Sequence, residues 1–255
     1  MAQGSTTERS AWIDINSDVG ELDDGGATDE LLLEVITSAN VACGGHAGDR
    51  ASMARICRTA AARRIAIGAQ VSYPDREGFG RRRLDITLPN LRASLDDQVC
   101  DLIDAAESAT TTVTYLKPHG ALYHVALDDA AIAELLLEIA AKHELAVLTM
   151  SSGELHTRAG RHDVPVFREA FIDRGYTANG RLTPRDIPGA LLEPEAALER
   201  LSAWSRAGLR DVDSLCVHSD TPDSVRLARL SREALESHGV AIEPFITIDP
   251  TTPRR

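Results

Sequence analysis

Short β-branched or apolar runs alternate with longer amphipathic segments along most of this chain. Such alternation is typical of repeated βα units around a parallel sheet. The pattern predicts strands at residues 12–16, 40–43, 65–70, 112–117, 145–149, 164–168 and 214–218. Helices are expected at residues 28–37, 50–64, 88–107, 130–142, 153–159, 194–206 and 223–237. Seven such pairs fit either a closed barrel or a doubly wound open sheet, and periodicity alone does not choose between them.

No low-complexity linker interrupts the alternation. We therefore expect one domain over residues 11–249, with residues 1–10 and 250–255 as flexible termini, because both ends are polar and lack periodicity. The net charge of −12 and the pI near 5.1 argue against nucleic acid and anionic membranes as principal partners. No apolar run approaches the roughly 18 residues of a membrane span, and no signal-like stretch is visible, so a cytoplasmic protein is expected.

The cysteines and lysines of this chain are informative because of their spacing and their number. The four cysteines form no CxxC pair, so they are interpreted as reduced and mostly buried thiols. Of the 27 basic residues only Lys117 and Lys142 are lysines. A lysine that lies in a motif therefore attracts attention, and Lys117 does.

Unusual polar residues gather at the C-terminal ends of the predicted strands. In both barrels and open α/β sheets that end carries the active site, because the βα loops converge there. Six such clusters favour an enzyme. They are NSDVGE (16–21), CGGHAGD (43–49), QVSYPD (70–75), KPHGALY (117–123), EAFIDRGY (169–176) and CVHSDTP (216–222).

The first two clusters carry acids and a histidine. Strand alternation places Asp14, Asn16 and Asp18 on one face, where a carboxylate can act as an acid or a base. The alternative is that Asp14 and Asn16 only tie neighbouring segments together. In the glycine-rich second cluster, His46 either faces a ligand or bonds to backbone, and Asp49 is expected to cap the next helix. The chain has no Walker A or Rossmann fingerprint.

The later clusters add cations and further acids. Lys117 and His119 flank a proline, so an ammonium that could stabilise an oxyanion lies beside an imidazole that could exchange protons. Asp173 and Arg174 form either a local ion pair or an acid beside an anion anchor. His218 and Asp220 follow the last strand in the same manner, and the arginine run at 81–83 is interpreted as a solvated loop. The remaining histidines receive no role.

The ordered motifs resemble the LamB/YcsF family, also known as the family of the 5-oxoprolinase A subunit. The resemblance runs from Ile13 to about Glu243 through DINSDVGE, SANVACGGHAGD, IAIGAQVSYPDREGFGRR, LKPHGALY, REAFIDRGY with RLTPR, and CVHSDTP. It implies a seven-stranded, TIM-like (β/α) barrel of the glycoside hydrolase/deacetylase type.

The resemblance also implies ATP-dependent hydrolysis of 5-oxoproline, the cyclic lactam of glutamate, to L-glutamate. The family's B and C subunits would be the partners, and ATP with Mg²⁺ the cofactor, held by this chain or by those partners. Phosphorylation of the lactam oxygen would create a better electrophile, which water then attacks. Such a route needs a base, a cation near the developing oxygen charge and an anchor for the substrate carboxylate.

The resemblance also implies roles for individual residues in the matched motifs. Asp18 or Asp173 is expected as the base, Lys117 as the cation, and His46 and His119 as proton-transfer or substrate-orienting groups. Further substrate-binding candidates are Asn16, Asn40, Arg174, His218 and Asp220.

The chain departs from the family pattern at two places. Gln70 and Val71 stand where the family usually has His-Pro, and Gly45 where it usually has a bulky residue. A neutral glutamine is a poor substitute for an imidazole in proton transfer or metal binding. Two alternatives therefore stay open: a metal-dependent deacetylase or amide hydrolase in which Asp18, His46 and His119 hold a cation, and a non-catalytic ligand-binding subunit.

Overall fold

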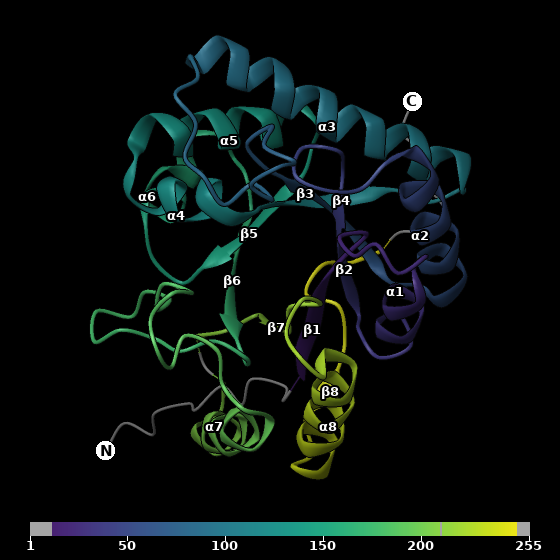
Figure 1. Cartoon of the computed structure of the whole chain (residues 1–255), viewed down its shortest axis with the longest axis vertical. Helices are drawn as coiled ribbons and strands as arrows, with labels where there is room; N and C mark the ends of the chain where they lie inside the picture. Colours follow the sequence, from purple (N-terminus) through teal and green to yellow (C-terminus); the bar gives the residue numbers. More distant parts are fainter. Residues whose placement is uncertain (1–11, 210, 249–255) are drawn as a thin grey trace, which may run out of the picture.

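Seven parallel strands close into a barrel in this computed structural model, which describes residues 12–209 and 211–248 (Figure 1). Each strand pairs with the next in sequence, and β7 also pairs with β1, which closes the ring. The fold prediction is confirmed, and closure decides against the open sheet. The strands are β1 (Trp12–Val19), β2 (Ser38–Ala42), β3 (Ala66–Val71), β4 (Val113–Pro118), β5 (Ala146–Met150), β6 (Val166–Phe171) and β7 (Ser214–Cys216).

The helices lie on the outside of this barrel (Figure 1). Asp49 caps the N-terminus of helix α2 (Arg50–Arg63), as expected: its carboxylate accepts a hydrogen bond from the Ser52 backbone N–H and completes a capping box. The helices are α1 (Ala27–Leu32), α2 (Arg50–Arg63), α3 (Leu88–Ser108), α4 (Gly120–Asp128), α5 (Ala130–Lys142), α6 (Glu154–Arg158), the 3₁₀ helix η1 (Ala159–Arg161), α7 (Pro194–Ala207) and α8 (Ser224–Ser237).

Three local features differ from the expectation. The sequence did not predict α4, which buries Leu122, Tyr123, Ala126 and Leu127 on one helical face. The α1 helix ends at Leu32 rather than at residue 37. A two-residue strand, β8 (Ala241–Ile242), pairs with the start of β1 and is too short to leave a periodic signal. The predicted flexible ends, 1–10 and 250–255, lie outside the described residues.

The inward face of β1 carries a ladder of buried polar side chains, as alternation predicted. Asp14 is the member of this ladder closest to the N-terminal end of β1, and its carboxylate accepts hydrogen bonds from the hydroxyls of Thr37, Ser38 and Ser214. Burial raises the pKa of Asp14 to about 6, although these hydroxyls oppose the shift. Asp14 therefore ties β1 to its two neighbouring strands and lies away from the loops.

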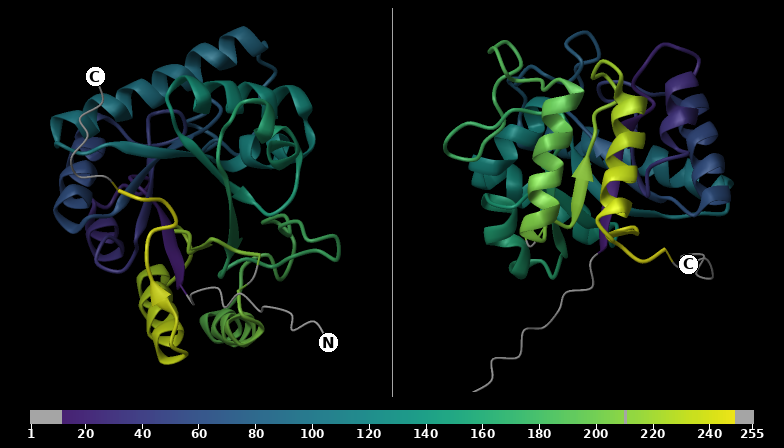
Figure 2. Two further views of the ribbon diagram at one scale, coloured as in Figure 1. Left: turned by 180° about the vertical axis from the view of Figure 1, so that it is seen from behind. Right: turned by 90° about the horizontal axis from the view of Figure 1, so that it is seen from below.

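The loops that follow β3 and β6 project from the same end of the barrel (Figure 2, right). All four cysteines are free thiols, and three of them are buried, as expected; Cys100 is exposed. Within the described part of the chain, no helix is long and apolar enough to cross a membrane.

The raised pKa of Asp14 predicts a pH-dependent stability. The folded state favours the neutral acid, so its contribution is complete below pH 3.8 and is lost as the pH rises towards 6. At about 1.4 kcal/mol per pH unit, the loss is on the order of 3 kcal/mol. Asp14→Asn lacks this titration, so relative to wild type it should gain stability between pH 4 and pH 7 in urea unfolding. Asp97→Asn, on the exposed face of α3, is the control, and a pH-independent difference for Asp14→Asn would contradict the assignment.

Candidate active site

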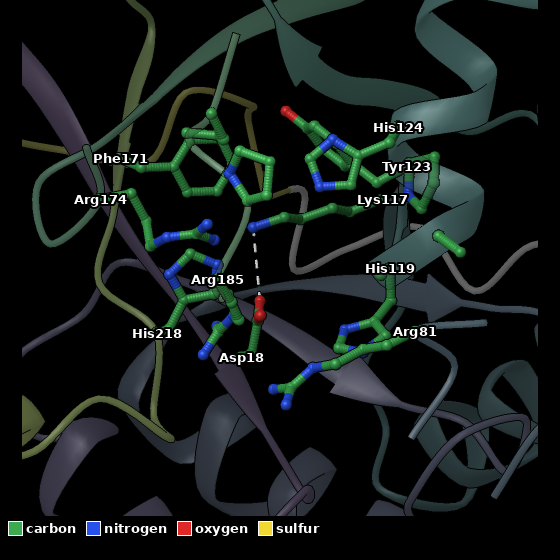
Figure 3. Close-up of a pocket in the computed structure, with 15 residues that line it drawn as sticks. Asp18, Arg81, Lys117, His119, Tyr123, His124, Phe171, Arg174, Arg185 and His218 are labelled. Atoms are coloured by element: carbon green, nitrogen blue, oxygen red, sulfur yellow. Dashed lines mark hydrogen bonds and ion pairs between the residues drawn. The ribbon is translucent and has the colours of Figure 1, made fainter. Parts of the chain in front are cut away.

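A cavity of about 330 Å³ opens at the loop end of the barrel (Figure 3). Five of the ten predicted site residues line it: Asp18, Lys117, His119, Arg174 and His218. They come from β1, β4 and the segments after β4, β6 and β7, as the clusters suggested. Other polar lining residues are Arg81, Tyr123, His124 and Arg185, while Phe171, Leu182, Pro118 and Pro184 supply apolar wall.

The ammonium group of Lys117 is buried between carboxylates. Its Nζ lies 3.3 Å from Asp18 Oδ1 and 2.9 Å from Glu169 Oε2, and it donates to Asn16 Oδ1 at 3.2 Å. Burial alone would lower the pKa of Lys117, but the charge of Asp18, with Cys216 and Glu169, raises it well above its ordinary value. Lys117 is therefore protonated.

Asp18 is held ionised by its surroundings. Burial acts to raise its pKa, yet the charge of Lys117, then those of His218 and His119, keep the pKa below the ordinary value. Asn40 supports the same carboxylate, since its Nδ2 lies 2.8 Å from both Asp18 Oδ1 and Asn16 Oδ1. A carboxylate with a lowered pKa is a weak base. Asn16 and Asn40, predicted to bind substrate, contact Asp18 and Lys117 from behind the cavity wall.

Asp173 acts on the cavity through His218. Its two carboxylate oxygens lie 3.0 Å from His218 Nδ1, and the Thr221 hydroxyl donates to it. Burial opposes ionisation, but His218 lowers the pKa of Asp173. The reciprocal effect of Asp173 outweighs burial and raises the pKa of His218. The pair thus presents a readily protonated imidazole to the cavity, and the predicted base Asp173 is fully buried behind it.

Arg174 does not pair with Asp173, so the local ion pair considered from the sequence is absent. Its Nε and Nη2 donate to the carbonyl oxygens of Ala190 and Thr183 at 3.0 and 2.8 Å. Only 4% of Arg174 is exposed, and no carboxylate among the described residues forms an ion pair with it. A fixed, buried guanidinium without a counter-ion lines the cavity.

Asp220 lies at the rim in contact with two arginines. Arg185 donates two hydrogen bonds to it, at 3.0 and 3.1 Å, and Arg81 pairs with one of the same oxygens. The 81–83 run is exposed, as expected, but Arg81 also lines the cavity. Asp220 therefore positions cations and does not itself line the cavity.

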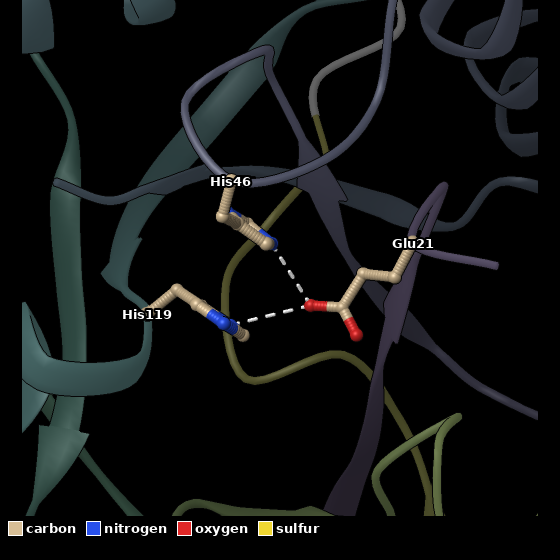
Figure 4. Close-up of side chains that lie close together, drawn as sticks. All are labelled: Glu21, His46 and His119. Atoms are coloured by element: carbon tan, nitrogen blue, oxygen red, sulfur yellow. Dashed lines mark hydrogen bonds and ion pairs between the residues drawn. The ribbon is translucent and has the colours of Figure 1, made fainter. Parts of the chain in front are cut away.

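A second group lies beside the cavity, where Glu21 meets both predicted loop histidines (Figure 4). Glu21 Oε1 is 3.0 Å from His46 Nε2 and 3.2 Å from His119 Nδ1. The two imidazole rings are stacked, with centroids 3.7 Å apart. Burial and then Asp18 raise the pKa of Glu21, and His46 opposes them. Among the described residues these three could hold a metal ion, whereas the alternative metal-dependent interpretation of the sequence names Asp18 with the two histidines.

Glu21 and Glu169 are the functional candidates that the sequence reasoning missed. Both belong to the polar clusters at strand ends, so the signal was present. Spacing along the chain could not show that Glu21 turns towards His46 and His119, or that Glu169 faces Lys117 across the barrel.

Comparison with known proteins agrees with this geometry. Residues 13–249 match the model of the LamB/YcsF family. The chain belongs to this family. A relative from Streptomyces avermitilis, named as the A subunit of 5-oxoprolinase, is 43% identical over 252 residues, covering 91% of this chain and 99% of that protein. One of the same name from Mycobacterium avium is 40% identical over 254 residues, covering 92% and 99%.

Solved structures support the fold. A lactam utilization protein from Thermus thermophilus superposes with a TM-score of 0.82 at 30% identity, covering 91% of this chain and 99% of that one. The catalytic domain of a peptidoglycan N-acetylglucosamine deacetylase from Eubacterium rectale gives 0.56 at 9% identity, covering 98% and 94%. At that identity the second likeness concerns the fold alone. The family and the fold expected from the motifs are confirmed, and both relatives carry the name of an A subunit of 5-oxoprolinase.

The contact between Asp173 and His218 predicts a measurable titration. Asp173→Asn removes the charge that favours the imidazolium, while burial still disfavours it, so the pKa of His218 should fall by about 1–3 units. NMR titration of the His218 ring protons measures this change. Thr221→Val removes a hydrogen bond to Asp173 and keeps its charge, so its effect should be smaller. An unchanged His218 pKa in Asp173→Asn would contradict the proposed coupling.

Proposed function

We propose that this chain opens the lactam ring of 5-oxoproline to give L-glutamate, as the A subunit of an ATP-dependent enzyme that also contains B and C subunits. Family membership and the relatives' names support this reaction. The observation that carries it is Arg174, because a buried guanidinium that forms no ion pair with a carboxylate of the described residues can bind an anion, and the substrate is a small carboxylate. The cavity of about 330 Å³ suits a ligand of this size.

Arg174 would bind the substrate carboxylate. Its backbone contacts to Ala190 and Thr183 fix the guanidinium before the ligand arrives, so little side-chain entropy is lost on binding. The charge of Arg185 adds to the positive potential at the same side of the cavity. Phe171 and Leu182 offer apolar surface for the ring methylenes. These contacts would orient the lactam carbonyl towards Lys117.

Ring opening then requires three groups: one that stabilises the oxyanion, one that accepts a proton from water and one that protonates the leaving nitrogen. Lys117, protonated and fixed by Asp18 and Glu169, would stabilise negative charge on the carbonyl oxygen. The cluster of Glu21 and its two histidines would accept a proton from the attacking water, since the raised pKa of Glu21 suits a base better than the lowered pKa values of Asp18 and Asp173. His218, charged beside Asp173, would protonate the departing ring nitrogen.

ATP would supply the driving force that a stable lactam lacks. Phosphorylation of the lactam oxygen, with release of ADP, creates a more electrophilic carbon. One water then adds to this carbon and the ring nitrogen leaves, which gives an acyl phosphate, and a second water hydrolyses that acyl phosphate to glutamate and phosphate. The chain has no Walker A or Rossmann motif, so we place ATP and its Mg²⁺ with the partner subunits or at a shared surface. Lys117, Arg81 and Arg185 offer positive charge for a phosphorylated lactam.

A metal-dependent amide hydrolase is the second candidate, favoured by the Glu21, His46 and His119 cluster. It predicts turnover of an unphosphorylated amide by this chain alone. A non-catalytic binding protein is the third alternative, and it predicts 5-oxoproline binding without turnover when all partners are present.

The deciding assay measures glutamate release from 5-oxoproline with and without ATP, using this chain alone and then the chain with its B and C subunits. We expect ATP-dependent release only in the complete mixture. ATP-independent release by the chain alone would favour the second candidate. No release by an assembled complex would overturn the proposed reaction.

Substitutions at the two cations should separate binding from chemistry. Arg174→Gln should raise KM for 5-oxoproline at least about tenfold with a smaller effect on kcat, because it removes a charged contact worth about 1.5–3 kcal/mol. Arg226→Gln, on the outer helix α8, is the matched control. Equal KM values for both variants would exclude Arg174 as the carboxylate anchor.

Lys117→Met should instead lower kcat by about a hundredfold or more, since its charge is proposed to act on the developing oxyanion. Lys142→Met, the other lysine of the chain, lies on the exposed end of α5 and is the control. Thermal unfolding of each variant checks that the barrel is intact. A folded Lys117→Met variant within a few-fold of wild-type kcat would contradict the assignment.

A further inference from the structure

The contacts behind the two clustered histidines determine which ring nitrogens carry protons. Ser72 Oγ donates its own proton to the Tyr73 carbonyl at 2.9 Å, so at 3.0 Å it can only accept from His46 Nδ1. In the neutral ring, His46 Nε2 then carries a lone pair. That lone pair faces Glu21 Oε1 at 3.0 Å.

His119 is constrained in the same way from the opposite side. Its Nε2 lies 3.1 Å from the Phe79 carbonyl oxygen, which can only accept a hydrogen bond. The proton therefore resides on Nε2, and Nδ1 presents its lone pair to Glu21 Oε1 at 3.2 Å. The lone pairs of both rings thus face the same carboxylate oxygen with no hydrogen between ring and carboxylate, and the only other group near His119 Nδ1 among the described residues is the Gln70 amide, at 3.1 Å. Such an arrangement is repulsive unless a positive charge lies among them.

The burial of the cluster makes this repulsion costly. The side chains of His46, Glu21 and His119 are only 0%, 2% and 8% exposed, so water screens them little. The stacking of the two rings brings both lone pairs to one side, and the three ligand atoms lie within 4.8 Å of one another. Each imidazole is oriented by an oxygen at its far nitrogen, which is how proteins usually hold metal-ligating histidines.

Gln70 supplies an independent observation. It is fully buried on β3, and its Nε2 lies 3.1 Å from His119 Nδ1 while its Oε1 has no hydrogen-bond partner. An unpartnered buried amide oxygen is costly. A 180° rotation of the Gln70 side-chain amide would exchange Nε2 and Oε1. Oε1 would then point towards His119 Nδ1 and the cluster. The oxygen would then face the cation, in place of the contact that Nε2 makes with His119 Nδ1.

We propose that Glu21, His46 and His119 bind one divalent first-row transition-metal ion of the zinc class, with the Gln70 amide oxygen turned towards it. Two imidazoles and one carboxylate suit Zn²⁺, Co²⁺ or Mn²⁺ far better than Mg²⁺ or Ca²⁺, which prefer oxygen ligands. Three protein ligands leave a coordination position for water, whose pKa a bound zinc-class ion lowers. His119 also lines the cavity with Lys117, so that position adjoins the substrate site.

Metal binding can be measured without turnover. The chain, stripped with a chelator, is titrated with Zn²⁺ by calorimetry and with Co²⁺ by visible absorption, in the presence and absence of millimolar Mg²⁺. We expect one ion per chain, Mg²⁺-insensitive binding, and Co²⁺ bands typical of nitrogen and oxygen ligation. Glu21→Gln and His119→Ala should each weaken Zn²⁺ binding at least about tenfold, and Ser72→Ala, which frees His46, by about 10–100-fold.

The matched control is His162→Ala. His162 Nε2 contacts Glu134 of helix α5 at 2.8 Å, and no third metal-ligating side chain joins this pair in the part of the chain that the structure describes, so this variant should bind Zn²⁺ like wild type. Thermal unfolding adds a second measurement, because an ion that binds only the folded state raises Tm. Zn²⁺ should raise Tm for wild type and His162→Ala but not for Glu21→Gln. This comparison also shows whether each variant folds.

Two results would overturn the proposal: no one-to-one Zn²⁺ binding by the wild type, or unchanged Zn²⁺ affinity in Glu21→Gln, His119→Ala and Ser72→Ala. A shared proton would then be the positive charge between Glu21 and the two histidines. The inference does not rest on the proposed reaction; with the ion bound, the lowered pKa of its water would take the place of the proton acceptance assigned above to these three side chains. Zinc binding without glutamate release by the complete complex would leave the metal site standing and remove the lactam reaction. Glutamate release by the complete complex of a chain that binds no metal would leave the lactam reaction standing and remove the metal site.

Discussion

The buried ammonium of Lys117 between Asp18 and Glu169 is the interaction on which the polar interior of this barrel depends. Three strands contribute these groups, and each would be costly to bury alone. Hydrogen bonds from Asn40 to Asp18 and from Lys117 to Asn16 satisfy further polar atoms. The strand ends are therefore locked together by charge as well as by backbone pairing, and Lys117 has one defined position.

Around this balanced centre lie two groups whose charges are not balanced internally. Arg174 is a buried cation held only by carbonyl oxygens. Glu21, His46 and His119 converge as electron-pair donors. Arg174 is suited to bind an anion, and the group of Glu21, His46 and His119 is suited to bind a cation. Arg174 and His119 lie on either side of Lys117 (Figure 3). In the proposed reaction this distribution of charge would bind and polarise a small anionic ligand.

Much of this arrangement could be predicted from the residues. The alternating pattern indicated all seven barrel strands, and the inward face shared by Asp14, Asn16 and Asp18 followed from the period of two in a strand. The motif clusters located the loop end that holds the cavity. The α4 helix was missed because its glycine and histidines, which follow Pro118, were interpreted as a loop; its helical face is recognisable only once Leu122 and Leu127 pack against neighbours.

The sequence by itself determined the family, the barrel and the loops that carry the site, because these depend on local periodicity and on residue order. Only the tertiary structure decided which side chains meet. It paired Asp173 with His218 rather than with Arg174, and it put Glu21 where Asp18 was expected beside the histidines. Barrel closure is the physical reason: it brings residues up to 200 positions apart, such as Asp14 and Ser214, within hydrogen-bond distance, and no spacing along the chain specifies those contacts.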